Sequence, residues 1–147
     1  MSMQLGYEDY EDLGSKSLNQ RPGSRKILLA DDCQDTRAIL SHFLENMGME
    51  VTTAENGQEC VDRAILAQDI RDPYDLIVVD ICMPTLNGND AAKQIRQNGY
   101  LGPIIALTGY ASISGRSESL HSGCDSYISK RAIDKDLLRK LVRQYCD

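Results

Sequence analysis

The stretch that most constrains the fold is the apolar run 76–79, Leu-Ile-Val-Val, which leads directly into Asp80. Three of its four residues are β-branched, which is typical of a strand rather than of a turn of helix. The run is continuously apolar instead of alternating, as expected for a strand covered on both faces within a parallel sheet. Pro84 and Gly88 indicate an irregular loop after it. A carboxylate therefore stands at the end of a buried strand, where ligands of open α/β sheets gather.

Four more segments repeat the pattern of a short apolar strand followed by a helix. The five expected strands cover residues 27–30, 50–53, 76–79, 103–107 and 126–128. A strand and a helix repeated five times predict a parallel sheet with helices on both faces. A chain of 147 residues holds one such domain, which buries roughly 68–70% of its unfolded surface. We therefore expect residues 25–147 to form a single α/β domain.

The expected helices differ in the strength of their pattern. The helix after the first strand carries five apolar residues on one face: Ile39, Leu40, Phe43, Leu44 and Met47. Asn56-Gly57 is a turn signal ahead of the second helix. The helix expected over 112–122 is weak, because Ile113 and Leu120 are its main apolar anchors.

Charge and cysteine content bear on partners and compartment. The formal net charge is −6 and the pI is about 4.9, which argue against a bulk electrostatic attraction to nucleic acid or an anionic membrane. Every apolar run is far shorter than a membrane span. We therefore expect no direct nucleic-acid partner and no membrane contact by this chain. The five cysteines are scattered and lack metal-ligand spacing, which predicts reduced thiols and a cytoplasmic location.

Residues 1–24 differ in composition from the rest of the chain. Acidic residues lie there among Gly, Ser, Asn and Gln, and a Pro-Gly-Ser sequence at 22–24 closes the stretch. This composition predicts a flexible acidic N-terminal extension or linker. A short helix from a preceding module is the alternative.

Polar side chains follow four of the five expected strands, at or near the point where each strand ends. Asp31 and Asp32 follow the first strand, Asp80 the third, Thr108 the fourth and Lys130 the fifth. The carboxyl ends of parallel strands meet at one edge of the sheet, so we expect these side chains to converge there. Neighbouring carboxylates repel one another unless a cation joins them. Oxygen ligands without a His or Cys cage select a hard ion, which predicts Mg²⁺.

A divalent cation, an ammonium and a hydroxyl form a set that binds phosphoryl groups, since phosphoryl transfer depends mainly on positioning and charge stabilisation. The phosphate loop G-x-x-x-x-G-K is absent from the sequence, so a bound nucleotide is not expected. The phosphoryl group is instead expected on the carboxylate of Asp80, as an acyl phosphate. The simpler alternatives are a helix cap for Asp31 and Asp32, a strand-end role for Thr108 and a solvated side chain for Lys130.

The order and spacing of these residues resemble those of response-regulator receiver domains in two-component signalling. The resemblance spans residues 25–146 and is carried by Asp31-Asp32, Asp80, Met83-Pro84, Gly88, Thr108 and Lys130. The stretches 102–108 and 123–127 most resemble receivers attached to hybrid sensor histidine kinases. The resemblance implies a flavodoxin-like, doubly wound (βα)5 fold, a five-stranded parallel sheet with strand order 2-1-3-4-5 and helices on both faces.

The resemblance also implies a role for each residue of the expected site. Asp80 would accept a phosphoryl group from a phosphohistidine on a histidine kinase or a histidine phosphotransfer protein. Mg²⁺ would be bound directly by Asp32, Asp80 and the backbone carbonyl of Cys82, with Asp31 acting through water. Lys130 would hold a phosphoryl oxygen.

The same resemblance implies a conformational switch. Thr108 would turn its hydroxyl toward the phosphoryl group and Tyr127 would follow it inward, changing the partner affinity of the helix–strand–helix surface at about 112–145. The chain would be a signalling phosphoacceptor rather than an enzyme, and would catalyse only its own phosphorylation and dephosphorylation. The family usually has proline after the lysine, whereas Arg131 stands here, and we hypothesise that Arg131 tunes the choice of donor.

Three other functions compete with this one. Phosphohydrolases of the haloacid-dehalogenase type also use a strand-end aspartate with Mg²⁺, but they need a second acid two residues later, where this chain has Cys82. An electron carrier of the flavodoxin type needs a Ser/Thr/Gly-rich flavin phosphate loop, which nothing here resembles. A degenerate receiver would bind partners without being phosphorylated. The intact set of acidic residues argues against this function, whereas Arg131, in place of the usual proline, is compatible with it.

Overall fold

The computed structural model describes residues 23–146. Of the predicted acidic extension at 1–24, only Gly23 and Ser24 fall within this range, so the prediction for the remainder lies outside the described residues. The first element begins at Lys26, one residue after the predicted start of the domain.

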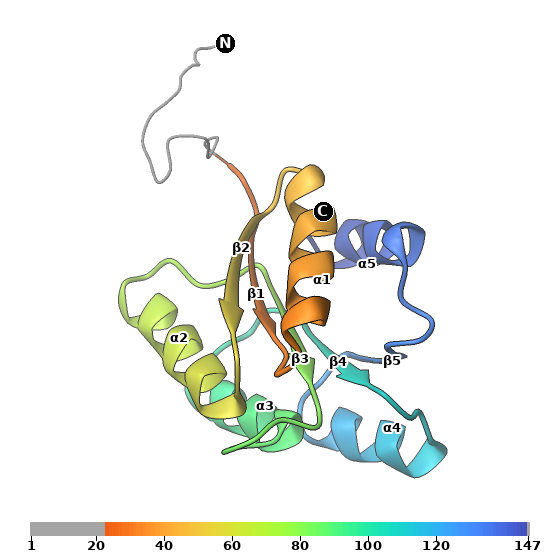
Figure 1. The fold of residues 1–147 in the computed structure, drawn as a ribbon. Helices are drawn as coiled ribbons and strands as arrows, with labels where there is room; N and C mark the ends of the chain where they lie inside the picture. Colours follow the sequence, from red (N-terminus) through yellow and green to blue (C-terminus); the bar gives the residue numbers. More distant parts are fainter. Residues whose placement is uncertain (1–22, 147) are drawn as a thin grey trace.

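Strands and helices alternate five times along the chain (Figure 1). The strands are β1 (Lys26–Ala30), β2 (Glu50–Ala54), β3 (Leu76–Asp80), β4 (Ile104–Thr108) and β5 (Ser126–Ser129). The helices are α1 (Gln34–Asn46), α2 (Gly57–Asp69), α3 (Gly88–Gln97), α4 (Ile113–His121) and α5 (Lys135–Cys146). All neighbouring strands pair in parallel, in the order β2-β1-β3-β4-β5. The predicted strand order 2-1-3-4-5 is therefore confirmed.

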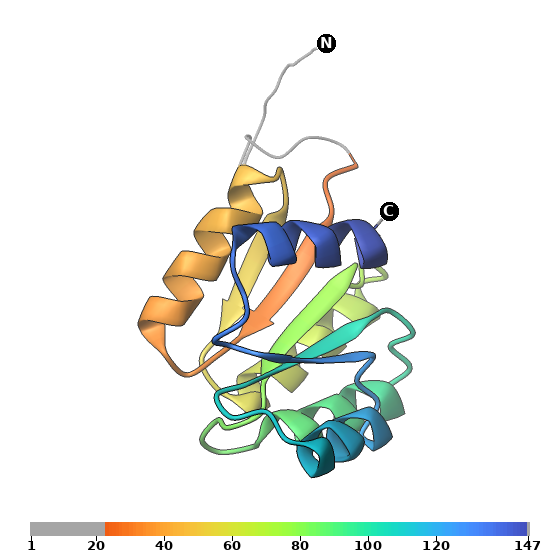
Figure 2. The ribbon, with the colours of Figure 1, turned by 90° about the vertical axis from the view of Figure 1, so that its right-hand side faces the viewer.

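The helices cover both faces of the sheet, as predicted (Figure 2). Leu40 and Leu44 of α1 and Leu138 and Leu141 of α5 belong to one buried cluster, while α2 and α3 contribute to a second cluster on the opposite face, which α4 also covers. Every residue of β3 and β4 is buried, because helices lie on both sides of these central strands. Within the described residues, every helix falls short of the length and hydropathy of a membrane span.

One residue of the apolar face predicted for α1 is exposed. Ile39 is 53% exposed, whereas Leu40 and Leu44 are buried. Consecutive residues are about 100° apart around a helix, and the buried stripe of α1 runs through Leu40 and Leu44. Ile39 therefore lies to the side of this stripe, in contact with solvent.

Polar contacts, rather than apolar anchors, hold α4. Ile113 is 91% exposed and Leu120 is 41% exposed, so the prediction that they anchor this helix is wrong. The fully buried Ser119 instead donates its hydroxyl hydrogen to Asn89 of α3 at 2.9 Å. Ser112 caps the helix by accepting a backbone hydrogen bond at 3.0 Å. Because hydroxyl groups make these contacts, the sequence of α4 has no helical repeat of apolar residues that would reveal them.

The Asn56-Gly57 pair begins a helix instead of forming a separate turn. Asn56 is the N-cap of α2, and its side chain accepts a hydrogen bond from the Glu59 backbone N–H at 2.8 Å. The Glu59 carboxylate in turn accepts a hydrogen bond from the Glu55 backbone N–H at 2.6 Å. These contacts satisfy backbone donors that the first turn of a helix leaves unpaired, which is why the same residue types serve as caps and as turn residues.

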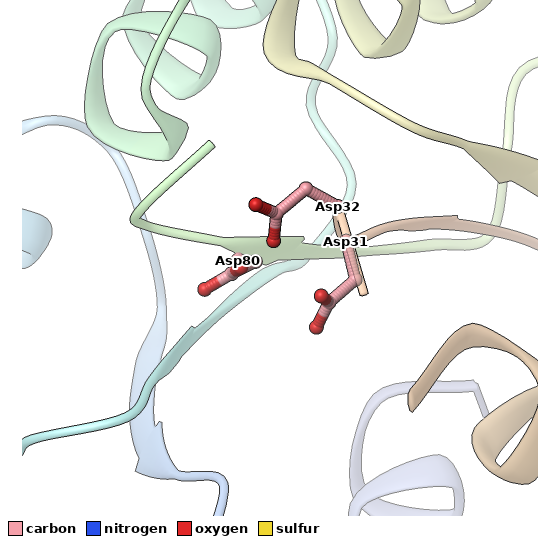
Figure 3. Close-up of side chains that lie close together, drawn as sticks. All are labelled: Asp31, Asp32 and Asp80. Carbon is pink, nitrogen blue, oxygen red and sulfur yellow. The ribbon is translucent and has the colours of Figure 1, made fainter. Parts of the chain in front are cut away.

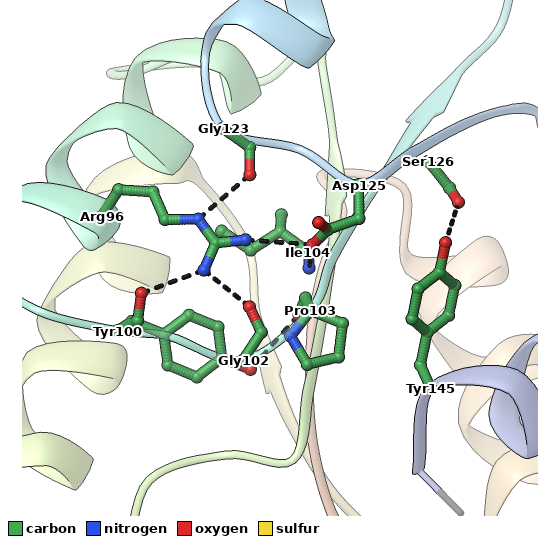
Figure 4. A network of polar contacts seen from close by, with 9 residues as sticks. All are labelled: Arg96, Tyr100, Gly102, Pro103, Ile104, Gly123, Asp125, Ser126 and Tyr145. Atoms are coloured by element: carbon green, nitrogen blue, oxygen red, sulfur yellow. Dashed lines mark hydrogen bonds and ion pairs between the residues drawn. The ribbon is translucent and has the colours of Figure 1, made fainter.

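Arg96 of α3 joins the loops that precede β4 and β5 (Figure 4). Its Nη1 donates to the carbonyl oxygens of Tyr100 at 2.9 Å and Gly102 at 2.6 Å. Its Nε donates to the Gly123 carbonyl at 3.0 Å, and its Nη2 donates to Asp125 Oδ2 at 3.0 Å. One side chain therefore fixes the strand-start edge of β4 and β5 to α3.

Candidate functional site

Three carboxylates meet beyond the ends of β1 and β3 (Figure 3). Ala30 of β1 pairs with Val79 of β3 in parallel register, so the residues that follow them, Asp31 and Asp80, come side by side. One carboxylate oxygen from each of Asp31, Asp32 and Asp80 lies within 4.8 Å of the others. Asp31 is fully buried and Asp80 is 2% exposed, while Asp32 is exposed. The three acidic side chains therefore lie close together, as predicted from the sequence.

Neither Asp31 nor Asp32 caps the first helix. The N-cap of α1 is Cys33, and its side chain makes no capping hydrogen bond. The Cys33 backbone N–H instead donates to Asp31 Oδ1 at 2.9 Å, which turns the loop back onto the end of β1. The alternative interpretation of the acidic pair as a helix cap is therefore wrong.

Lys130, which follows β5, reaches two of the three carboxylates. Its Nζ lies 2.9 Å from Asp31 Oδ2 and 3.1 Å from Asp80 Oδ2, and its side chain is 25% exposed. Lys130 Nζ donates a hydrogen bond to Asp80 Oδ2 and forms an ion pair with Asp31 Oδ2. The buried Asp31 Oδ2 accordingly receives no hydrogen bond from the described residues.

The electrostatics of the site leave it short of positive charge. Burial raises the pKa of Asp80, and the neighbouring Asp31 carboxylate raises it further, to about 6, although the hydrogen bond from Lys130 acts in the opposite direction. Burial alone would lower the pKa of Lys130, but its contacts with Asp31 and Asp80 outweigh burial and raise it. One ammonium therefore balances only part of the charge of three carboxylates.

The donor set fits a hard divalent cation. The candidate ligand atoms are all carboxylate oxygens, one from each of Asp31, Asp32 and Asp80. The Lys130 ammonium contacts two of these carboxylates, and the charge that it leaves unbalanced makes a further cation favourable. Mg²⁺ prefers such oxygen ligands and keeps some of its waters, which the exposed position of Asp32 allows.

The loop after β3 is folded tightly against the strand end. The Gly88 N–H donates to the Ile81 carbonyl at 2.8 Å, and a Cβ at Gly88 would lie 2.3 Å from the Asp80 carbonyl oxygen. Only glycine allows α3 to begin this close to Asp80. The Cys82 backbone N–H donates to Asp80 Oδ1 at 3.4 Å, a long contact. Gly88, predicted as a loop marker, therefore controls how closely this loop approaches the acids.

Thr108, at the end of β4, is buried with its hydroxyl turned into its own loop. Thr108 Oγ1 donates to the Tyr110 carbonyl at 3.1 Å and accepts from the Tyr110 backbone N–H at 3.2 Å. The Thr108 carbonyl accepts a hydrogen bond from the Lys130 backbone N–H at 2.8 Å. Thr108 thus lies next to Lys130 through its backbone, while its hydroxyl bonds to Tyr110.

Tyr127 of β5 points inward, beneath the loop that leads to α4. It is 8% exposed, and its hydroxyl accepts from the Ser112 backbone N–H at 3.2 Å and donates to the Tyr110 carbonyl at 3.5 Å. A Cβ at Gly115 of α4 would lie 2.5 Å from this hydroxyl oxygen. The inward position of Tyr127 therefore requires glycine at 115.

Gly115→Ala is expected to push the Tyr127 ring out of this position and to lower stability. Alanine normally stabilises a helix by about 1 kcal/mol relative to glycine, so a loss would show that the collision outweighs this gain. Urea unfolding measures the stability, and the ring signals of Tyr127 in an NMR spectrum report its position. Gly109→Ala is the matched control, because a Cβ there meets nothing within 4 Å. Removing the hydroxyl in Tyr127→Phe should largely rescue Gly115→Ala; an equal loss in both backgrounds would contradict the collision.

The turn after Lys130 uses a backbone donor that proline lacks. The Arg131 N–H donates to Ser129 Oγ at 3.2 Å, and the Ala132 N–H donates to the Ser129 carbonyl at 3.0 Å. Ser129 thereby closes the turn that presents the Lys130 ammonium to the acids. Arg131 itself is exposed beside the site.

Gly115 and Ser129 are the two site residues that the sequence did not reveal. A lone glycine within an expected helix is a signal of close approach, and it could have identified Gly115. Ser129 carries no comparable signal, because a serine at a strand end is common.

Comparison with known proteins agrees with this geometry. Residues 27–143 match the response regulator receiver domain family. The transcriptional regulatory protein CpxR of Escherichia coli is 34% identical over 116 residues, which are 79% of this chain and 47% of that protein. The osmosensing histidine protein kinase SLN1 of Saccharomyces cerevisiae is 32% identical over 125 residues, 84% of this chain and 10% of that protein. The chemotaxis protein CheY4 of Vibrio cholerae has a similar structure, with a TM-score of 0.73 and 29% identity over 83% of this chain and 98% of that one.

The family match covers nearly all of the described residues, from β1 to the last turns of α5. The chain spans only about half of CpxR and a tenth of SLN1, so it corresponds to one domain of each. The chain therefore belongs to the response regulator receiver domain family, the phosphoacceptor domains of two-component signalling.

Proposed function

We propose that Asp80 is the residue of this receiver domain that takes the phosphoryl group. The observation that carries this proposal is the surroundings of its carboxylate at the end of β3. Lys130 Nζ lies 3.1 Å from Asp80 Oδ2, and oxygens of Asp31 and Asp32 lie within 4.8 Å. A nucleophilic carboxylate needs a neighbouring cation and room for a phosphoryl group, and this edge of the sheet is open to solvent at Asp32.

In the proposed reaction, a carboxylate oxygen of Asp80 attacks the phosphorus of a phosphohistidine. The P–N bond breaks, its electron pair goes to the imidazole, and Asp80 carries an acyl phosphate. Lys130 exchanges its contact with the Asp80 carboxylate for one with a phosphoryl oxygen. In dephosphorylation, water attacks the phosphorus, which releases phosphate and restores the carboxylate. These two reactions of the chain on itself are the only ones that it catalyses.

Mg²⁺ is proposed to be held by Asp32, Asp80 and the backbone carbonyl of Cys82 directly, and by Asp31 through water. When bound, it neutralises charge on the phosphoryl oxygens. The oxygen-only donor set and the charge of three carboxylates that the Lys130 ammonium only partly balances support this assignment. The ion would also relieve the repulsion between Asp31 and Asp80, whose proximity raises the pKa of Asp80.

Phosphorylation is proposed to change the α4–β5–α5 surface through Thr108 and Tyr127. Both hydroxyls donate to the same acceptor, the Tyr110 carbonyl, at 3.1 Å and 3.5 Å. When the Thr108 hydroxyl turns to a phosphoryl oxygen, it no longer donates to the Tyr110 carbonyl. The Tyr127 hydroxyl then has this acceptor to itself, and its hydrogen bond can shorten. The exposed Ile113 and Leu120 of α4 give this surface apolar side chains for a partner.

The donor is proposed to be a histidine kinase or a histidine phosphotransfer protein in the cytoplasm. The similarity to part of SLN1, a histidine protein kinase, supports a place next to a kinase, either as a separate chain or as a domain of a hybrid kinase. Cys33, Cys60, Cys82 and Cys124 are free thiols, which supports a reducing compartment.

Chemical trapping tests the assignment of Asp80. The protein is incubated with Mg²⁺ and a small phosphodonor and then treated with borohydride, which reduces an acyl phosphate to an alcohol. Peptide mass mapping is expected to find homoserine at position 80 and unchanged aspartate at Asp31 and Asp32. Homoserine at 31 or 32, with Asp80 intact, would overturn the assignment.

Arg131→Pro is expected to slow phosphotransfer and to widen or shift the range of donors. Proline removes the N–H that donates to Ser129 Oγ at 3.2 Å, and it removes a charge beside the site. The measurement is the rate of phosphotransfer from several phosphorylated histidine phosphotransfer proteins. Arg131→Ala is the control that removes the charge but keeps the N–H. An unchanged rate and donor range in both variants would contradict the hypothesis that Arg131 tunes donor choice.

A further inference from the structure

A hollow that has no part in the phosphoryl site lies between the C-terminal end of α1 and α5, which come together near the top of Figure 2. It has a volume of about 320 Å³ and is lined by Asn46, Met47, Met49, Arg139, Val142 and Arg143. Val142 is buried and Met47 and Met49 are half-buried, so these apolar side chains form part of a lining that is otherwise polar. Met49 directly precedes β2, which places the hollow at the strand-start edge, opposite the edge that carries Asp80.

Two exposed arginines give the hollow positive charge. Arg143 makes no hydrogen bond or ion pair with any described residue. Arg139 contacts Asp136 at 3.4 Å, and the Asp136 side chain is 85% exposed. Such exposed pairs are weak, so Arg139 can exchange this partner for another carboxylate. The hollow therefore suits an occupant that has both apolar side chains and negative charge.

The N-terminal part of this chain has that chemistry. Residues 7–13 read Tyr-Glu-Asp-Tyr-Glu-Asp-Leu, so a Tyr-Glu-Asp unit occurs twice in succession and a leucine follows. Large side chains recur at every third position, Tyr7, Tyr10 and Leu13, with a pair of carboxylates between each. The stretch carries four negative charges and no positive one.

The chain enters the domain beside the hollow. The Arg25 carbonyl accepts a hydrogen bond from the Glu50 backbone N–H at 2.8 Å, and Glu50 follows Met49 of the hollow. Residues 14–24 are the eleven residues between Leu13 and Arg25. A random-coil chain of eleven residues spans roughly 17–20 Å, at about 5–6 Å × √n. So short a tether gives an effective concentration on the order of millimolar, at which weak contacts are enough for occupancy.

We propose that residues 7–13 dock into this hollow of their own chain. Their large side chains lie over Met47, Met49 and Val142, and their carboxylates face Arg139 and Arg143. The docked segment covers the junction of α1 and α5. This contact does not depend on the role of Asp80, and salt weakens it because its charge pairs are exposed.

Methyl-labelled methionine tests the contact in the full chain. NOE cross-peaks are expected from the ring protons of Tyr7 or Tyr10 to the methyl groups of Met47 or Met49. Met83, buried beside the acidic site, is the internal control and should show none. The variants Tyr7→Leu and Tyr10→Leu assign the ring signals. No phosphodonor is present, so the result is separate from that of the phosphorylation experiments.

Charge variants of the full chain test the recognition. Neutralising the segment (Glu8→Gln, Asp9→Asn, Glu11→Gln, Asp12→Asn) should abolish the cross-peaks, as should Arg139→Glu with Arg143→Glu. Adding Glu11→Lys and Asp12→Lys to the arginine variant should restore them, which a misfolded α5 would not allow. Lys93→Glu, an exposed cation on α3, should leave them unchanged.

Two results would overturn the proposal. The first is the absence of these cross-peaks in the wild-type chain. The second is their appearance only between chains, in an isotope-filtered spectrum of mixed labelled and unlabelled protein, which would assign the hollow to the segment of a second copy.

Discussion

Arg96→Met is expected to lower the free energy of unfolding by about 2–4 kcal/mol, since hydrogen bonds from a charged group contribute roughly 1.5–3 kcal/mol each before discounting for partial exposure. The Arg96 side chain is 25% exposed and donates to three carbonyls and one carboxylate. Methionine keeps most of the aliphatic stem but none of the donors, so the Gly102 and Gly123 carbonyls lose their bonds. Urea unfolding followed by circular dichroism measures the change.

Arg63→Met is the matched control for this prediction. Arg63 lies on α2 and pairs only with Glu59 at 3.2 Å among the described residues, with 44% of its side chain exposed. Its replacement should change stability by no more than about 0.5 kcal/mol. A single hydrogen bond contributes a net stabilisation of about 1 kcal/mol. A loss of stability below about 1 kcal/mol for Arg96→Met would therefore contradict the view that Arg96 holds the strand-start edge together. Equal losses in Arg96→Met and Arg63→Met would contradict it as well.

Asp80→Asn is expected to stabilise the metal-free protein at neutral pH by about 1–3 kcal/mol, one pKa unit corresponding to about 1.4 kcal/mol. The pKa of Asp80 is raised from its ordinary value of 3.8 to about 6, first by burial and then by Asp31. The folded state therefore binds this proton more tightly than the unfolded state does. The stability of the wild type should fall as pH rises from about 4 to about 6, and then stay low. Asparagine has no proton to lose, so the variant should lack this fall.

Urea unfolding in a chelator at pH 5 and pH 8 measures this effect. The difference between Asp80→Asn and wild type should be larger at pH 8, and adding Mg²⁺ should stabilise the wild type more than the variant. Asp62→Asn is the control, because Asp62 is exposed on α2 and contacts only Gln58 at 3.0 Å within the described part of the chain. Equal stability of wild type and Asp80→Asn at both pH values would contradict the electrostatic description of the site.

The sheet and the acidic centre could be predicted because they depend on local patterns. The uniformly apolar run before Asp80 identified a strand buried on both faces, and β3 is buried throughout. Once the strands were known to be parallel, Asp31, Asp32, Asp80 and Lys130 had to share one edge of the sheet. Their convergence follows from topology and needs no knowledge of side-chain packing.

The other features of the structure depend on contacts with backbone groups elsewhere in the chain. No periodic pattern in the sequence indicates such contacts. Arg96 reads as an ordinary solvated helix residue, yet it bonds to Gly123 and Asp125, 27 and 29 residues away. The direction of the Thr108 hydroxyl depends on the Tyr110 backbone, and the direction of Tyr127 depends on the space beside Gly115. Residue type predicted that these side chains belong to the site but not which way each one points.

The most direct test of the central claim is Mg²⁺-dependent labelling of Asp80, read by intact mass. Wild-type protein incubated with a small phosphodonor and Mg²⁺ should gain the mass of one phosphoryl group, and should gain none when a chelator replaces Mg²⁺. Asp80→Asn should gain none under either condition, although it is expected to be folded and more stable. Equal labelling of wild type and Asp80→Asn would contradict the account.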